Sequence, residues 1–287
     1  TGHNETITGM DSSSLQPWFS SAPSFQYDLL LGEGFTPSAP LLKSLLALST
    51  TPLSEEFRNG GEGGGTSPNI YDGWGRLNLS EVIDVEAIQS ELMQEDVRPI
   101  ENMWVHDSYR LIGSEPVDLI HQRKGSGEPL ESLLSTPWDG EGAQGPFLGT
   151  GDVFQQRFIL QQGQDLDIRM SFQAKPEPHM VDDLQLLVRL PDGRFAVGDT
   201  YKESGLSKLY YDFADPSNMS AFPSTNETTV GISLSSENLD SSDWVDVFVV
   251  GRYVSPGNTP NSIGVEGNKI GFGMVIQGVV LDPIGHT

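Results

Sequence analysis

Apolar side chains recur at every second position through the C-terminal half of the chain, and this pattern constrains the fold most. Residues 165–172, Asp-Leu-Asp-Ile-Arg-Met-Ser-Phe, alternate polar and apolar without a break. The same period appears in residues 184–190, 230–234, 245–249 and 272–276. Because successive side chains of a strand point to opposite faces, each segment is predicted to be a strand with one buried face. Short strands separated by turn residues are typical of an antiparallel sandwich.

A helix is predicted at residues 38–49, where leucines recur at helical spacing. Ser38 is a suitable N-cap, and Pro40 suits the first turn. Leu41 and Leu48 share one face, so the helix should be buried against another segment. The first hundred residues offer little for it to pack on, which favours a partner upstream of this chain.

The segment Gly73-Trp74-Gly75-Arg76 predicts a sharp turn beside a buried indole, because glycine permits unusual backbone angles. A short strand or turn should follow, and then a helix over residues 80–98. The preceding loop, residues 58–69, is rich in glycine but lacks the Gly-Lys-Ser/Thr ending of a phosphate-binding loop. Ser67 in that loop precedes Pro68 and is interpreted as an ordinary loop residue.

These segments, taken in order, resemble the end of the catalytic domain of subtilisin-like serine peptidases (subtilases). In that family a Thr-Pro-x-x-(Leu/Val)-(Leu/Ile)-Lys helix and a variable loop precede Gly-Trp-Gly-Arg. The matching residues here are Thr36-Pro37, Leu41-Leu42-Lys43 and Gly73-Trp74-Gly75-Arg76. The resemblance implies that residues 1–98 are the C-terminal remnant of a subtilase α/β catalytic domain.

The residues that perform subtilase chemistry are missing from the sequence. The family nucleophile lies in Gly-Thr-Ser-Met-Ala-Thr-Pro, whereas the corresponding stretch here is Met10-Asp11-Ser12-Ser13-Ser14. Ser12 is nearest to the nucleophile position, but nothing around it builds a nucleophile site, and the family's Asp, His and oxyanion Asn motifs are absent. A serine without a neighbouring base is not activated. We therefore expect no catalytic residue in this chain and no peptidase activity from it alone.

The C-terminal half resembles the jelly-roll-like sandwich that follows the catalytic domain in the oxidant-resistant alkaline protease group of subtilases. The matching residues are Val181-Asp182-Asp183-Leu184, Pro191-Asp192-Gly193 and Gly198-Asp199, followed by residues 244–249 and 270–279. The expected fold class is an α+β fragment, in which a short helical remnant of a subtilase α/β domain precedes an antiparallel, jelly-roll-like β-sandwich. Residues 1–98 form the remnant, 99–151 an irregular connector, and 152–287 the sandwich.

The connector is expected to contain short strands around residues 103–105 and 109–112. It also holds the adjacent His106 and Asp107, with His121 further along. Because no His-x-x-x-His spacing appears, we interpret these histidines as surface residues and not as metal ligands.

Asp182, Asp183 and Asp199 stand at expected turns of the sandwich. Calcium takes oxygen ligands from such loops, and the related sandwiches bind calcium. The resemblance therefore implies Asp183 and Asp199 as calcium ligands. The alternative is turn formation by aspartate without any metal, and no Asp-x-Asp-x-Asp-Gly loop is present.

The formal net charge is −24, from 40 acidic and 16 basic residues. Phosphate backbones would be repelled, so nucleic acid is not expected as a partner. No apolar run approaches the roughly 18 residues of a spanning helix, so no membrane span is expected. There is no cysteine, which excludes disulfides, thiolate metal sites and a cysteine nucleophile.

Four Asn-x-Ser/Thr sequons predict glycosylation at Asn4, Asn78, Asn218 and Asn226. They are compatible with an extracellular protein, either secreted or on the cell surface. The chain begins with polar residues and lacks a signal-peptide pattern, so it resembles a processed chain or a fragment.

Two functions follow from these observations. The first is the C-terminal portion of an extracellular subtilisin-like serine endopeptidase, whose upstream chain carries the triad while the sandwich supports the catalytic domain or the substrate. The second is a pseudo-protease-derived structural or adhesive glycoprotein, with protein partners in an extracellular assembly. A carbohydrate-binding module ranks third, because no strand face carries an aromatic stripe.

Overall fold

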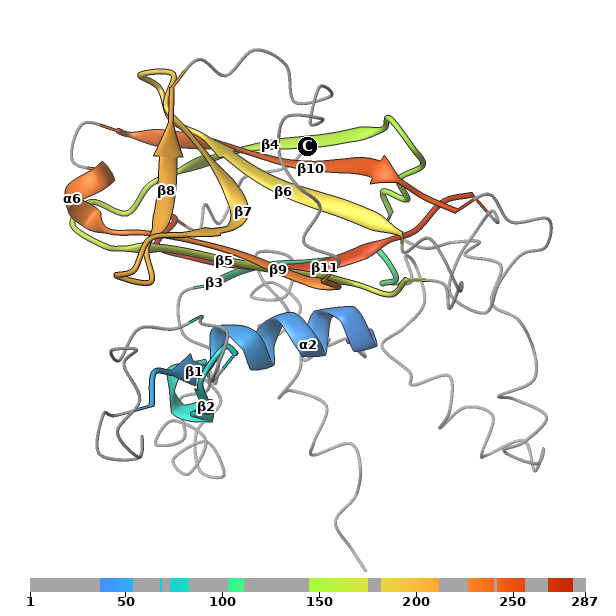
Figure 1. The fold of residues 1–287 in the computed structure, drawn as a ribbon, viewed down its shortest axis with the longest axis horizontal. Coiled ribbons are helices and arrows are strands. Elements are labelled where there is room, and N and C mark those ends of the chain that lie inside the picture. Colours follow the sequence, from blue (N-terminus) through green and yellow to red (C-terminus); the bar gives the residue numbers. More distant parts are fainter. Residues whose placement is uncertain are drawn as a thin grey trace, which may run out of the picture.

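The computed structural model describes residues 37–53, 68, 73–82, 103–110, 145–174, 182–211, 227–239, 242–255 and 268–280. In these residues the chain is an α+β fold dominated by two antiparallel sheets that face each other, and a helix lies against one of them (Figure 1). The predicted fold class is therefore confirmed, whereas the jelly-roll-like connection of the strands stays a prediction.

One sheet has five strands in the order β4-β10-β6-β7-β8. Their bounds are β4 Val153–Ile159, β10 Trp244–Tyr253, β6 Asp183–Arg189, β7 Phe195–Tyr201 and β8 Ser207–Tyr210. All four pairings are antiparallel. The turn predicted at residues 191–193 joins β6 to β7, where the Leu190 N–H donates to the Arg194 carbonyl at 2.8 Å.

The other sheet has four strands in the order β3-β11-β5-β9, also antiparallel throughout. Their bounds are β3 Met103–Asp107, β11 Phe272–Gln277, β5 Leu166–Phe172 and β9 Thr229–Leu234. A short helix, α6 Ser236–Leu239, follows β9. The predicted strand segments of the C-terminal half are confirmed in both sheets.

The core lies between the sheets and consists of the alternating apolar residues. Fully buried members include Ile168, Met170, Leu186, Val188, Val230, Ile232, Val247, Val249, Met274 and Ile276. Burying such a side chain contributes about 1.5–3 kcal/mol, so the period of two sets both the faces of the strands and their register.

Strand β3 belongs to the sandwich, although the sequence pattern assigns residues 99–151 to a connector. Its residues pair with Gly273–Gln277 of β11, so the sandwich includes chain well before residue 152. The strand expected at 103–105 is confirmed. Of the second strand expected at 109–112, Tyr109 lies in a turn that the Arg110 N–H closes by donating to the Asp107 carbonyl at 3.1 Å, and residues 111–112 lie outside the described residues.

Helix α2, Ala39–Leu48, packs on the outer face of the four-stranded sheet (Figure 1). Ser38 is its N-cap, as predicted, and accepts a hydrogen bond from the Leu41 N–H at 3.3 Å. Leu41 and Leu48 join the same buried cluster as the sandwich core. The expectation of an upstream packing partner was therefore wrong for this face, because the partner is a sheet formed by residues more than fifty positions later in the chain.

A small two-stranded sheet lies at the end of α2, formed by β1 Thr50–Thr51 and β2 Arg76–Leu77. A 3-10 turn, Leu79–Glu81, follows β2 at the expected start of the 80–98 helix, whose remainder lies outside the described residues. Residues 1–36 and most of the glycine-rich loop also lie outside them. Among the described helices, none has the length and apolar character needed to cross a membrane.

Candidate functional site

The N-terminus of α2 is held by Asp107, the last residue of β3. Its carboxylate accepts hydrogen bonds from the Ser38 N–H at 2.7 Å, the Ser38 hydroxyl at 2.8 Å and the Tyr109 N–H at 3.1 Å. Burial raises the pKa of Asp107 above its ordinary value, and these hydrogen bonds partly offset the rise. One buried carboxylate thus joins the edge strand to the first turn of the helix.

We expect Asp107→Ala to lower the free energy of unfolding by about 2–3 kcal/mol, because half-buried donors on Ser38 and Tyr109 would lose their acceptor. Asp107→Asn retains an acceptor oxygen and should cost less. Urea denaturation of both variants measures the difference. A midpoint for Asp107→Ala equal to that of the wild type would show that this carboxylate does not anchor the helix.

Trp74 lies against Gly231 in the middle of β9. A β-carbon on Gly231 would stand 2.6 Å from the indole and 2.7 Å from the Tyr201 hydroxyl oxygen, so glycine is needed there. The Trp74 and Tyr201 rings meet edge to face with centroids 6.4 Å apart, and the Arg169 guanidinium lies 5.0 Å from the Trp74 ring centre. The flanking Gly73 and Gly75 have φ of 58° and 108°, which supports the turn predicted from sequence.

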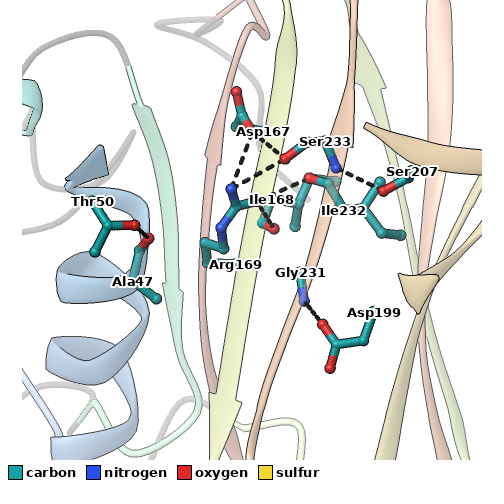
Figure 2. Close-up of polar contacts among 10 residues, drawn as sticks. All are labelled: Ala47, Thr50, Asp167, Ile168, Arg169, Asp199, Ser207, Gly231, Ile232 and Ser233. Atoms are coloured by element: carbon teal, nitrogen blue, oxygen red, sulfur yellow. Dashed lines mark hydrogen bonds and ion pairs between the residues drawn. The ribbon is translucent and has the colours of Figure 1, made fainter. Parts of the chain in front are cut away.

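Arg169 contacts the Trp74 ring and links strands β5 and β9. Figure 2 shows its contacts with residues of both strands. Its Nη1 donates to the carbonyls of Ile168 at 2.9 Å and Ile232 at 3.1 Å. Its Nη2 donates to Asp167 at 3.3 Å and to the Ser233 hydroxyl at 3.1 Å. Arg169 is only 8% exposed, so these contacts hold its guanidinium in a fixed position beside the indole.

Side chains from the other sheet accept hydrogen bonds from backbone N–H groups on the outer edge of β9 (Figure 2). The Gly231 N–H donates to Asp199 of β7 at 2.9 Å, and the Ser233 N–H donates to the Ser207 hydroxyl of β8 at 2.9 Å. These bonds cover edge N–H groups that would otherwise pair with another chain. They also connect the two sheets directly beside the Trp74 turn.

The two predicted calcium ligands have separate partners within the protein. Asp183 forms an ion pair with Arg252 at 3.6 Å, whereas Asp199 accepts the Gly231 N–H. Asp182 is buried and accepts the Ser255 N–H. In the described part of the chain, no three His, Cys, Asp or Glu side chains lie together in a way that could hold a metal. These contacts do not favour a shared site, and calcium binding stays a prediction.

His106 is buried at 6% exposure, so the interpretation as a surface histidine was wrong. Its ring stacks on Trp104 and lies 4.8 Å from the Phe272 ring, and burial lowers its pKa to about 4. Its Nε2 lies 3.2 Å from the hydroxyl of Ser108, which accepts the Phe272 N–H. Asp107 points to the opposite face of the strand, toward α2. Among the residues that the structure describes, no acid contacts this serine–histidine pair, and its burial denies access to a substrate.

Of the remaining predicted site residues, most lie outside the described part of the chain, and Asn78 lies within it. Ser12, His121, Asn4, Asn218 and Asn226 lie outside them. Asn78 is half-buried, its amide donates to Glu81 at 2.9 Å, and its oxygen accepts the Ser80 hydroxyl at 2.7 Å. Its sequon neighbours Leu79 and Ser80 are exposed, so the acceptor position is on the surface.

Sequence reasoning missed three residues of the junction between helix, turn and sandwich: Asp107, Arg169 and Gly231. Gly231 carried a signal, because a glycine inside a strand pattern often marks a close approach of another segment. Asp107 and Arg169 carried none, since their partners are distant in sequence.

No protein-family model matches this chain, and a search of curated proteins finds no sequence similar to it. The function therefore has to be argued from the residues and their geometry.

Proposed function

We propose that this chain is the C-terminal portion of an extracellular subtilisin-like serine endopeptidase, and that its sandwich supports the catalytic domain. The observation that carries the proposal is the placement of α2 and the Trp74 turn. These two segments resemble the end of a subtilase catalytic domain, and both are seated on the four-stranded sheet. A sandwich that packs against both segments would hold the last part of the catalytic domain in place.

Three contacts make the support rigid. Asp107 binds the first turn of α2, the Ser44 hydroxyl donates to the Gly273 carbonyl at 2.9 Å, and Trp74 rests on Gly231. Each involves buried or half-buried groups, so the helix and the turn should move as one body with the sandwich.

Helix α2, strand β2 and the 3-10 turn expose apolar side chains on the side away from the four-stranded sheet. Leu46 on α2, Leu77 on β2 and Leu79 in the 3-10 turn are 45%, 51% and 44% exposed. Large exposed aliphatic side chains on neighbouring elements favour contact with another protein surface. An upstream catalytic segment is the partner that the proposal requires on this side.

The chemistry would then reside in the upstream chain. A serine peptidase needs a nucleophile, a base in contact with it and an acid that orients the base. Within the described residues, the one contact between a serine hydroxyl and a histidine ring is that of Ser108 with His106, and both residues are buried. We expect the purified chain to leave a generic peptide substrate intact, and hydrolysis by this chain alone would contradict the proposal.

Fluorophosphonate labelling of native material tests the proposal, because the reagent marks only an activated serine. We expect the label on a second, co-purifying chain after denaturing separation and peptide mapping. A label on Ser12 would mean that the chain carries its own active site. An unlabelled preparation that contains the upstream chain would favour the alternative described next.

The alternative is a pseudo-protease-derived structural or adhesive glycoprotein. One observation favours it: the main apolar face of α2 is already covered by the sandwich of the same chain. The chain therefore does not need an upstream partner to bury that face. Association with other non-catalytic proteins, without any labelled serine, is the expected result under this alternative.

A further inference from the structure

We propose that the outer face of the five-stranded sheet carries a binding site for a neutral saccharide. The site is an open hollow of about 440 Å³, lined by Arg189, Leu190, Pro191, Asp192, Gly193, Tyr211 and Trp244. This volume is in the range of small-molecule sites, roughly 300–1,000 Å³. The hollow lies on the sheet that does not contact α2, so the inference does not depend on the proposed protease role.

Two aromatic side chains line the hollow. Tyr211 follows β8 and is 74% exposed, while Trp244 begins β10. The Arg157 guanidinium lies 3.6 Å from the centre of the Trp244 ring and fixes its orientation. Tyrosine and tryptophan offer large, rigid contact surfaces with few rotatable bonds. The C–H face of a sugar ring stacks on such rings, because their faces carry partial negative charge.

The hollow also presents a donor and an acceptor for hydroxyl groups. Arg189 is held by Asp246, with Nη2 at 2.6 Å from the carboxylate oxygen. Asp192 accepts the backbone N–H of Arg194 at 2.9 Å and forms an ion pair with the Arg194 guanidinium. A guanidinium and a carboxylate fixed at one site match the alternating donors and acceptors of neighbouring sugar hydroxyls.

The charges around the hollow favour a ligand without net charge. Asp246 is paired with both Arg157 and Arg189, and Asp192 is paired with Arg194. Burial raises the pKa of Asp246, but the hydrogen bonds from Arg157 and Arg189 outweigh that effect and hold it below its ordinary value. These carboxylates therefore stay ionised beside the three guanidinium groups, and an anionic ligand would have to compete with them for the same donors. The net charge of −24 on the whole chain also disfavours an anion.

A buried apolar layer beside the site should keep its geometry fixed. Leu187, Phe195, Val197, Phe248 and Val250 form a second cluster, separate from the main core. It is carried by the same strands that position Arg189 and Trp244, so binding should need little rearrangement of the backbone.

Titration of the full chain with soluble neutral hexasaccharides of glucose, mannose and N-acetylglucosamine tests this site. We expect at least one to bind, measured by calorimetry and by tryptophan fluorescence. Tyr211→Ala should weaken that binding at least about tenfold, whereas Tyr211→Phe, which retains the ring, should stay within about threefold. Because Tyr211 is 74% exposed, both variants should fold like the wild type, and circular dichroism checks this directly.

Leu77→Ala is the matched control, because Leu77 is an exposed side chain on the α2 side of the molecule. It should leave saccharide binding unchanged. Absence of binding by every hexasaccharide at millimolar concentration would overturn the proposal. Equal binding by the wild type and Tyr211→Ala would also overturn it.

Discussion

Gly273→Ala should lower the free energy of unfolding by about 3 kcal/mol and loosen helix α2 from the sheet. A β-carbon at position 273 would stand 2.3 Å from the Leu41 nitrogen and 2.4 Å from the Leu41 Cα. These are backbone atoms of the helix, so no side-chain rotation can relieve the clash. The helix must shift outward, and that movement would stretch the 2.9 Å bond from the Ser44 hydroxyl to the Gly273 carbonyl.

Two measurements separate the helix from the rest of the fold. Urea denaturation gives the total loss of stability, and hydrogen exchange follows the Leu42 N–H, which donates to the Ser38 carbonyl at 3.0 Å in the first turn. We expect this amide to exchange faster in Gly273→Ala. Leu46→Ala changes an exposed face of the same helix and should cost no more than about 0.5–1 kcal/mol. Unchanged stability and exchange in Gly273→Ala would mean that the helix is not held by this close approach.

The strands could be predicted because their signal is local. Residues 166–172 and 272–277 show the period of two within a few positions, so the strands and their core-facing sides follow from that period. The burial of their other face could not be predicted, because it depends on helix α2 packing there. The N-cap of α2 could also be predicted, since Ser38 and Leu41 are three residues apart. Local chemistry determines these features, so a single sequence contains them.

The assembly of the junction could not be predicted, because its contacts join distant parts of the chain. Ser38 and Asp107 are 69 residues apart, and Ser44 and Gly273 are 229 apart. The five residues of β3 are all buried, so they show no alternation of polar and apolar types to place them in a sheet. The glycines at 231 and 273 were the available clues, since each interrupts a strand pattern where another segment approaches.

The residues that share the candidate site could not be identified from sequence for the same reason. His106 and Asp107 are adjacent in sequence, yet the pleat of β3 turns one into the core and the other toward α2. Asp183 and Asp199 both belong to the segments that resemble the alkaline protease sandwich, yet Asp183 contacts Arg252 and Asp199 contacts Gly231. Which residues share a site depends on strand pairing, which the motif spacing does not specify.

Asp199 should make the stability of the sandwich depend on pH through the mildly acidic range. Its pKa is raised from 3.8 to about 6, chiefly by burial; the Gly231 N–H and Arg169 lower it, and Glu227 raises it. Because the folded protein holds this proton more tightly than the unfolded chain, the contribution of Asp199 to stability is greatest below pH 3.8. It is lost as the pH rises through about 6, and the loss amounts to at most about 3 kcal/mol.

Asp199→Asn isolates this effect from the other acidic residues. Asparagine keeps an acceptor oxygen for the Gly231 N–H and tolerates the φ of 58° that residue 199 adopts. The wild type should lose stability relative to this variant between about pH 4 and about pH 7, as measured by denaturation at each pH. The carboxyl carbon of Asp199 should titrate in NMR spectra with a midpoint near pH 6.

Asp192→Asn provides a control of opposite sign. Burial raises the pKa of Asp192, but the hydrogen bonds and the charge of Arg194 together outweigh that effect and hold it below the ordinary value. Asp192 therefore contributes stability above its unfolded pKa and loses that contribution as the pH falls through the folded pKa. If the wild type and Asp199→Asn instead lose stability in parallel across the range, the Asp199 carboxyl does not titrate as its buried position between the two sheets requires.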